Sequence, residues 1–397
     1  MSSYVTGIGV ISAIGKNVKE NLEALLAKRT GISCLTLFES THDVPVGELK
    51  LSNEELQQML GLPITKTYSR TALLGMVAVK EALTDAGIKT NSGLRIGLIS
   101  STSAGGMDLS ENFYKEMLAK PNGGRLRNVI SHDCGDSTEK IADFVGIRDY
   151  VTTISTACSS SANAIMLADR MLKHNLLDVV VAGGIDPLCL FTINGFSSLM
   201  ILDKELCRPF DETRAGLNLG EGAGFIVLQR EDTLKDKKPY CQLAGYANEN
   251  DSYHQTATSP DGDGPLRAMA GALKKAGLKP EDVDYVNVHG TGTGNNDQSE
   301  GTALKRLFGD KIPHFSSTKV YTGHTLGAAG GIEAVYSILS ITQDVVFSTY
   351  NFKNPMTDIM LTPVVDTIHN AGVNVVMSNS FGFGGNVSSL VFSSLKK

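Results

Sequence analysis

The chain of 397 residues is 42% hydrophobic and 20% charged, which suffices for one large core or for two fused half-domains. Its formal net charge of −6 offers no general attraction to nucleic acid or to anionic membranes, and we expect neither as a partner. No basic segment followed by a long apolar run opens the sequence, so we expect no signal peptide, no membrane anchor and a cytoplasmic location.

Short apolar or β-branched runs alternate with segments whose apolar residues recur at helical spacing. In the first half we predict strands over 4–10, 95–100, 151–155, 178–183 and 223–229, and helices over 76–86 and 159–174. The second half repeats this order, with strands over 241–247, 283–289, 373–378 and 388–393, and helices over 266–276 and 331–340. The alternation predicts βαβ crossovers, buried and largely parallel sheets, and a duplicated α/β layout with a boundary near 236–238.

Cys158 stands where a predicted strand meets a predicted helix. Ala162, Ile165 and Met166 follow it on one helical face, which predicts a buried helix that begins at the cysteine. The free N–H groups and the dipole of such a helix end favour a nucleophilic thiolate. The six cysteines show no Cys-x-x-Cys or Cys/His ligand spacing, so we expect no disulfide framework and no metal, and a structural role stays open for any one of them.

Two histidines lie in glycine-rich turns. His289 ends an apolar strand and enters the glycine-rich segment 290–294, at the strand end where α/β folds build their sites. His324 precedes a Gly/Ala-rich segment typical of a tightly packed helix, with Lys319 and Glu333 as flanking charges. Each of these four residues also has a structural reading, as a satisfied histidine or an ordinary surface charge.

The segment 378–386 places Phe381 and Phe383 in a glycine-rich turn between two strands. Such a loop can supply a backbone N–H while its rings act as a lid. The alternative is a β-turn whose phenylalanines belong to the core.

Taken in this order, the motifs at 156–160, 289–293, 319 with 323–330, and 379–385 resemble the β-ketoacyl-acyl-carrier-protein synthases, specifically the elongating, type II-like members. The resemblance runs over essentially the whole chain. It implies a thiolase-like fold in which duplicated βαβ halves form five layers, α-β-α-β-α. Residues 1–237 would carry the nucleophile and residues 238–397 the two histidines and the phenylalanine loop. It also implies a homodimer, or a heterodimer with a second ketosynthase-like chain.

The resemblance implies a decarboxylative condensation that needs no cofactor, because the substrates arrive on the phosphopantetheine arm of an acyl carrier protein. Cys158 would take the acyl group, with the N–H groups of Cys158 and Phe383 as oxyanion hole. His289 and His324, as neutral donors, would hold the malonyl thioester carbonyl. The remaining implied roles are support of the histidines and loop by Lys319, Glu333, Asp297, Glu300 and Phe381, and binding of substrate or pantetheine by Thr291, Thr293, Ala104 and Phe196.

Two positions depart from the family pattern. Ala104 stands where relatives often carry a larger aliphatic residue at the end of the acyl pocket, which predicts room for a long, rigid or polyunsaturated chain. Met200 stands where a basic residue that contacts the carrier is common. Lys66 and Arg70 therefore become the candidate patch for an acidic carrier protein.

Four other readings share parts of this pattern. A chain-length-factor-like partner subunit would lack the nucleophile, and a degradative thiolase would need a second cysteine near the C-terminus, where none follows Cys241. An initiating synthase would carry asparagine in place of His324, and a cysteine peptidase has no use for a second histidine beside Phe381 and Phe383. The choice between primary fatty-acid synthesis and a polyketide-like or aryl-polyene-like pathway stays open.

Overall fold

The computed structural model describes residues 3–120, 122–234 and 237–395 and is built around one mixed sheet of ten strands. The sheet order is β10-β9-β13-β14-β8-β1-β7-β6-β4-β5. Its strands are β1 Ser3–Ser12, β4 Ile96–Ser101, β5 Tyr150–Ile154, β6 Val179–Asp186, β7 Gly222–Arg230, β8 Cys241–Asn250, β9 Tyr285–Asn287, β10 His314–Ser316, β13 Val375–Gly382 and β14 Asn386–Ser393. Two small ribbons add β2 Ile32–Ser33 with β3 Val46–Gly47, and β11 Val345–Val346 with β12 Ile368–His369.

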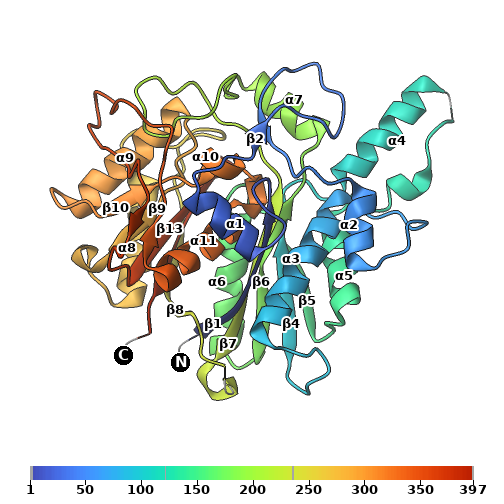
Figure 1. Cartoon of the computed structure of the whole chain (residues 1–397), viewed down its shortest axis with the longest axis horizontal. Coiled ribbons are helices and arrows are strands. Elements are labelled where there is room, and N and C mark those ends of the chain that lie inside the picture. The colour runs from blue at the N-terminus through green and yellow to red at the C-terminus, as the bar shows by residue number, and fades with distance from the viewer. Residues whose placement is uncertain (1–2, 121, 235–236, 396–397) are drawn as a thin grey trace.

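The α-helices connect these strands and cover the sheet (Figure 1). They are α1 Val18–Leu26, α2 Asn53–Leu60, α3 Arg70–Ala86, α4 Met107–Ala119, α5 Cys134–Val145, α6 Ser160–Lys173, α7 Leu190–Ser198, α8 Asp263–Ala276, α9 Gly294–Phe308, α10 Lys319–Thr322 and α11 Ala329–Gln343. In the described part of the chain, none of them combines the length and the apolar character that a membrane crossing requires.

The two halves of the sheet have the same design. From the middle outward, β1-β7-β6-β4-β5 on one side corresponds to β8-β14-β13-β9-β10 on the other, with the same succession of antiparallel and parallel pairs. The prediction of largely parallel sheets is wrong, because only the pairs at the two outer ends are parallel. One reason is that β13 and β14 are joined by a tight turn, which forces an antiparallel hairpin.

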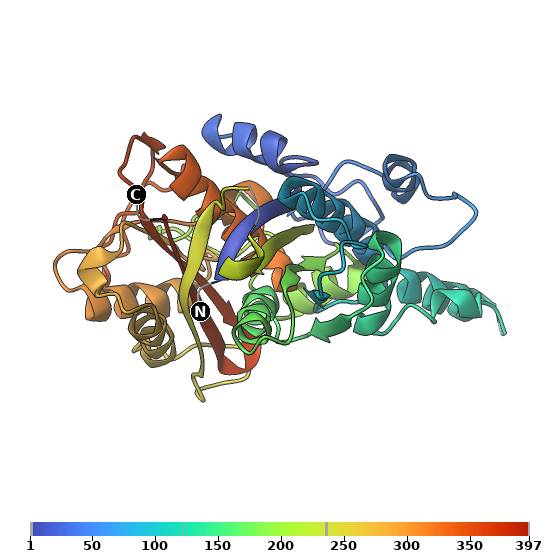
Figure 2. The ribbon, with the colours of Figure 1, turned by 90° about the horizontal axis from the view of Figure 1, so that it is seen from below.

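The sheet bends so that its two halves face each other across two central helices. Both α6 and α11 contact strands of either half, while α3 and α5 cover the outer face of one half and α8 and α9 cover that of the other. Figure 2 shows the two halves and their outer helices from below. This arrangement is the predicted five-layered α-β-α-β-α fold.

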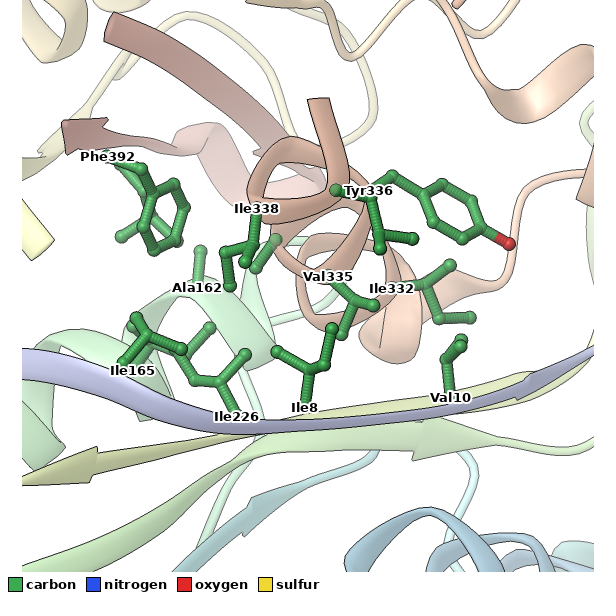
Figure 3. Packing of buried hydrophobic residues seen from close by; sticks show 14 of the residues in the cluster. Ile8, Val10, Ala162, Ile165, Ile226, Ile332, Val335, Tyr336, Ile338 and Phe392 are labelled. Atoms are coloured by element: carbon green, nitrogen blue, oxygen red, sulfur yellow. The ribbon is translucent and has the colours of Figure 1, made fainter. Parts of the chain in front are cut away.

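Apolar side chains of the central helices form the main core. Ile332 and Val335 of α11 pack over Ile8 and Val10 of β1, with Ile165 of α6 beside them (Figure 3). All of these side chains are buried. Burial on this scale is the main stabilising contribution to a fold of this size.

Two glycines let the outer helices approach the middle strands closely. A Cβ on Gly7 would lie 2.3 Å from the carbonyl oxygen of Ala82 in α3, and a Cβ on Gly245 would lie 2.3 Å from that of Ala272 in α8. Gly7 of β1 and Gly245 of β8 thus occupy equivalent places in the two halves. The duplication extends to the fit between strand and helix.

Element boundaries differ from the prediction where local signals compete. Helix α3 begins at Arg70, six residues before the predicted start at 76, because the Ser69 hydroxyl caps it by accepting from the Ala72 N–H. Strand β9 is shorter than the predicted strand 283–289. The proposed boundary between halves adjoins residues 235–236, which lie outside the described residues, so it stays a prediction.

Arg70 does not lie on an exposed patch, which corrects its assignment as a carrier contact. Only 4% of the residue is exposed, and its guanidinium forms a bidentate ion pair with Glu221, at 2.7 Å for both Nε and NH2. It also donates to the backbone carbonyls of Leu49 and Leu51. Sequence could not reveal the partner, because Glu221 lies 151 residues away.

We predict that Arg70→Met lowers the free energy of unfolding by about 3–5 kcal/mol, because it leaves the carboxylate of Glu221 buried without its counter-charge. The matched control is Arg95→Met, which removes an ion pair to Asp178 whose arginine side chain is 46% exposed, and should cost about 1 kcal/mol or less. Denaturant unfolding of both variants measures the difference. Equal losses would contradict the role assigned to Arg70.

Candidate active site

Cys158 lies in a strained elbow between β5 and α6. Ala157, just before it, has a φ of +53°, a left-handed conformation that residues with a side chain rarely adopt. The Ser160 N–H donates to the Ala157 carbonyl, and the Ser160 hydroxyl accepts from the Thr156 N–H, which stabilises the turn. Helix α6 begins at Ser160, two residues after the cysteine, so the nucleophile precedes the helix instead of opening it.

The fold brings both predicted histidines to this cysteine. Nε2 of His324 lies 3.1 Å from Sγ of Cys158. The ring of His289 stands edge-on to that of His324, with centroids 5.2 Å apart. His289 follows β9 and His324 follows α10, so the second half of the chain supplies the histidines to the cysteine of the first.

Backbone N–H groups favour the thiolate of Cys158 as expected, but burial outweighs their effect. Burial raises the pKa of the Cys158 thiol to about 12, and the Asp186 carboxylate adds to the rise. The Lys319 ammonium and the backbone N–H groups of Phe383 and Cys158 oppose this increase without cancelling it. The thiol is therefore protonated near pH 7, and its proton needs an acceptor when the sulfur reacts.

Both histidines are neutral at pH 7. Burial holds the pKa of each ring well below its ordinary value, and the positive charge of Lys319 lowers both further. Lys319 itself is buried in an ion pair with Glu333, whose pKa is raised to about 7 by burial. The Nδ1 atoms of both rings are buried and find no hydrogen-bond partner within the described residues, so Nε2 is the ring nitrogen suited to chemistry.

Two buried carboxylates of α9 fix the turn that carries His289. Glu300 accepts hydrogen bonds from the backbone N–H groups of His289 and Gly290, at 2.9 and 2.8 Å. Asp297 accepts from the N–H of Gly292 and from that of Phe210. Both residues therefore take the supporting places that the resemblance implied, by holding backbone and not by touching the rings.

The backbone of His324 is held on both sides. Its N–H donates to the Asn218 carbonyl at 2.7 Å, and its carbonyl accepts from the Gly220 N–H at 2.9 Å. The next residue, Glu221, is the buried partner of Arg70. The pair Arg70–Glu221 thus anchors the segment against which His324 rests.

The phenylalanine loop closes over the cysteine. Gly382 packs on the elbow so tightly that a Cβ there would lie 2.9 Å from the Thr156 carbonyl oxygen. The ring of Phe383 stacks on that of Phe196, with centroids 5.7 Å apart, and the ring of Phe381 lies 5.6 Å from His289. Both readings of the loop hold in part, because Phe381 is buried while Phe383 is only half-buried.

A cavity of about 140 Å³ opens in front of these residues. Its lining includes Cys158, both histidines, Phe196, Phe381, Phe383, Thr291 and Thr293. The binding of a pantetheine arm by the two threonines stays a prediction. Sequence reasoning missed part of the lining, which comes from segments without a motif: Ile201, Leu217, Thr256, Ala257, Thr258 and Asn295.

Ala104 does not line this cavity. Its side chain is buried, and its backbone N–H donates to the carboxylate of Asp186, which also accepts from Thr102, Ser103 and the N–H of Gly327. Sequence reasoning missed Asp186, a buried acid held by five groups. The place of Ala104 at the end of an acyl pocket stays a prediction.

Lys66 is exposed, as a carrier contact must be. It lines a surface groove together with Arg127 and Lys140, and Leu62, Ile130 and Phe144 give this groove an apolar part. Arg127 and Lys140, which lie far away in sequence, add two basic groups to this groove, and Asp143 adds an acidic one. Lys140 is paired with Asp136 at 2.7 Å.

Two family models match this chain. The model described as Beta-ketoacyl synthase, N-terminal domain, matches residues 4–233, and that described as Beta-ketoacyl synthase, C-terminal domain, matches residues 240–353. Among curated proteins, the 3-oxoacyl-[acyl-carrier-protein] synthase 2 of Staphylococcus aureus (strain COL) is 34% identical over 98% of this chain and 97% of its own length. The synthase 2 of Synechocystis sp. is equally similar, with the same coverage.

Solved structures agree. The ishigamide ketosynthase/chain length factor superposes with a TM-score of 0.93 at 27% identity and covers 100% of this chain and 99% of its own. The complex of the ketosynthase ApeO with its chain length factor ApeC from Xenorhabdus doucetiae gives 0.86 at 29% identity, with 99% and 98% covered. With models matching most of its length and relatives 34% identical end to end, the chain belongs to the β-ketoacyl synthase family.

Proposed function

We propose that this protein elongates an acyl chain by decarboxylative condensation of an acyl group on Cys158 with a malonyl thioester. The observation that carries the proposal is the 3.1 Å contact between Cys158 Sγ and His324 Nε2, with His289 beside it and the N–H groups of Cys158 and Phe383 at the sulfur. Cys158, His289, His324 and Phe383 all line one cavity. The named activity of the S. aureus and Synechocystis relatives supports it.

The first step transfers the acyl group to Cys158. The sulfur attacks the thioester carbonyl and its proton passes to His324 Nε2, in the tautomer whose Nε2 is free to accept it. The ring then returns this proton to the pantetheine sulfur as it leaves. The tetrahedral oxyanion forms next to the N–H groups of Cys158 and Phe383. Because this thiol has a high pKa, the step depends on an acceptor placed at hydrogen-bond distance.

The second step releases carbon dioxide from the malonyl group. The carbon–carbon bond breaks and its electron pair becomes an enolate. The enolate oxygen accepts hydrogen bonds from the Nε2–H groups of His289 and His324, with His324 now in the tautomer that carries its proton on Nε2. The enolate carbon attacks the acyl–Cys158 carbonyl, and the cysteine leaves as a thiolate that takes up a proton from solvent. Neutral rings suit this task, since a donor that keeps its proton stabilises the enolate without protonating it.

We further infer that the substrates arrive on an acyl carrier protein, that no cofactor takes part, and that the chain forms a homodimer. The carrier is acidic in this proposal, and Lys66 with Arg127 and Lys140 forms the surface that meets it. Relatives were solved with a chain length factor, so a heterodimer is the second possibility. The native mass of the purified chain alone distinguishes the two.

A chain-length-factor-like role without catalysis is the second candidate function, and the fold similarity to complexes that contain such a subunit favours it. The geometry of the site argues against this non-catalytic role. A subunit without catalysis has no need for a buried cysteine held 3.1 Å from a neutral histidine.

We expect a panel of acyl carrier proteins to transfer acyl groups to the chain, with an intact-mass increase equal to the acyl group. The Cys158→Ala variant should show no such adduct. The His289→Ala variant should accept the acyl group but elongate it at least about a hundredfold more slowly, because one donor to the enolate is lost. Absence of any adduct on the native chain would refute the enzyme reading in favour of the partner-subunit reading.

Alkylation of Cys158 by iodoacetamide should rise with pH. With a thiol pKa of about 12, the thiolate fraction grows about tenfold for each pH unit across the range from pH 7 to 9. Mass spectrometry of the modified peptide follows the rate, and Cys158→Ser corrects for the exposed Cys34. An alkylation rate that does not change with pH above pH 7 would mean that Cys158 is already a thiolate there, and would contradict the prediction.

Lys66→Glu should raise KM for the acyl carrier by about tenfold at low salt and leave kcat nearly unchanged, because it opposes the docking of an acidic partner. The control is Lys311→Glu, which makes the same charge change at an exposed residue. Lys311 precedes β10 and His289 follows the parallel strand β9, so the two residues lie at opposite ends of this strand pair. Steady-state kinetics at two salt concentrations measure both. An equal rise in KM for the two variants would mean that net charge alone causes the effect, and would contradict a docking role of Lys66.

A further inference from the structure

We propose that Asn386 is a positioning residue that holds the phenylalanine loop against the nucleophile, and so sets the distance between the two N–H groups of the oxyanion hole. The inference rests on the proposed function and deepens it. It concerns a residue outside the cavity, which touches neither the cysteine nor the lining histidines by any hydrogen bond among the described residues.

Three donors converge on one oxygen of Asn386. Its Oδ1 lies 2.6 Å from the Ser159 hydroxyl, 3.0 Å from Nδ2 of Asn163 and 2.6 Å from Nδ2 of Asn248. Two amide NH₂ groups face this atom, so it is the carbonyl oxygen of the side chain that points inward. Within the described residues Asn386 uses its side chain as an acceptor alone.

Two of the three donors belong to the nucleophile elbow. Ser159 directly follows Cys158, and its hydroxyl also lies 2.7 Å from the Thr156 carbonyl, so its one proton serves either acceptor. Asn163, one turn into α6, donates to the Thr156 hydroxyl at 2.8 Å as well. Asn386 therefore holds the residues that follow Cys158, and Ser159 and Asn163 in turn link it to Thr156 on the other side of the cysteine.

On its other side, Asn386 forms the base of the loop that carries Phe383. It is the first residue of β14 and pairs with Gly382, the last of β13, so only three residues separate the two. Gly382 already rests on the Thr156 carbonyl. The Phe383 N–H thus lies in a short loop whose two feet, Gly382 and Asn386, both contact the elbow.

The outer part of the loop is held differently. The Gly384 N–H donates to the Gln255 carbonyl, the Gly384 carbonyl accepts from Asn250, and the Gly385 carbonyl accepts from the Asp251 N–H. These bonds tie the tip to the segment 250–255 and away from the cysteine. Asn386 is the residue whose side chain links the loop to the nucleophile elbow by hydrogen bonds.

Such a link is needed because the two oxyanion donors come from distant parts of the chain. The N–H groups of Cys158 and Phe383 must both reach the same developing charge, and a misplacement of about 1 Å costs on the order of a hundredfold in rate. Packing of Gly382 fixes one foot. The two hydrogen bonds that the elbow residues Ser159 and Asn163 donate to the Asn386 side chain fix the other.

The test compares Asn386→Leu, which removes the acceptor, with Asn386→Asp, whose carboxylate accepts the same three hydrogen bonds. Asn248→Leu is the matched control, since it removes only the donor from β8. For each variant two rates at Cys158 are measured: acyl loading, which passes through an oxyanion, and iodoacetamide alkylation, which does not. Hydrogen exchange of the segment 382–386 is followed in the same proteins.

We expect the ratio of loading to alkylation to fall about 10- to 100-fold in Asn386→Leu, with faster exchange of 382–386. The ratio should stay within about threefold of the native value in Asn386→Asp and Asn248→Leu, because added charge or lost packing changes both rates together. A native ratio in Asn386→Leu, or an equal fall of both rates, would overturn the proposal.

Failure of the proposed function has a different signature. In that case the native chain loads no acyl group, and hydrogen exchange alone decides whether Asn386 holds the loop. Unchanged exchange of 382–386 in Asn386→Leu then overturns the positioning role, and faster exchange supports it.

Discussion

The close approach of α6 and α11, the two central helices, is the constraint on which the rest of the site depends. Gly330 and Gly331 lie in the first turn of α11. A Cβ on Gly330 would lie 3.1 Å from the backbone nitrogen of Ala162 in α6, and a Cβ on Gly331 would lie 2.3 Å from the Gly224 carbonyl oxygen of β7. The Gly331 N–H donates directly to the Ser161 hydroxyl of α6. Because both helices begin at this contact, the segments that lead into them bring Cys158 and His324 together.

Burial sets the protonation states of Cys158 and the two histidines. Taken out of water, the thiol keeps its proton and the histidines lose theirs, so the resting site holds neutral groups beside one ion pair, Lys319–Glu333. A neutral site has little charge to reorganise before negative charge develops, and fixed N–H donors are then most effective. The positive charge of Lys319 favours that same negative charge.

Backbone held by buried carboxylates gives the site its rigidity. Glu300 holds the turn of His289, Glu221 holds the segment beside His324, and Asp186 joins the loop 102–104 to Gly327. Each acid accepts several N–H groups from segments distant in sequence, which offsets part of the cost of its burial. None of these acids lines the cavity itself. They support the site through the backbone segments that they hold.

By itself the sequence determined the alternation of strands and helices, the cysteine at a strand–helix junction, the two histidines in glycine-rich turns and the family, because these features are local patterns. Tertiary structure alone decided the rest. The ion pair of Arg70 with Glu221 turned a predicted surface contact into a buried anchor. Burial raises the pKa of the Cys158 thiol more than the backbone N–H groups lower it. Both depend on which groups surround a residue in space, and solvent exclusion and long-range partners leave no mark in the neighbouring sequence.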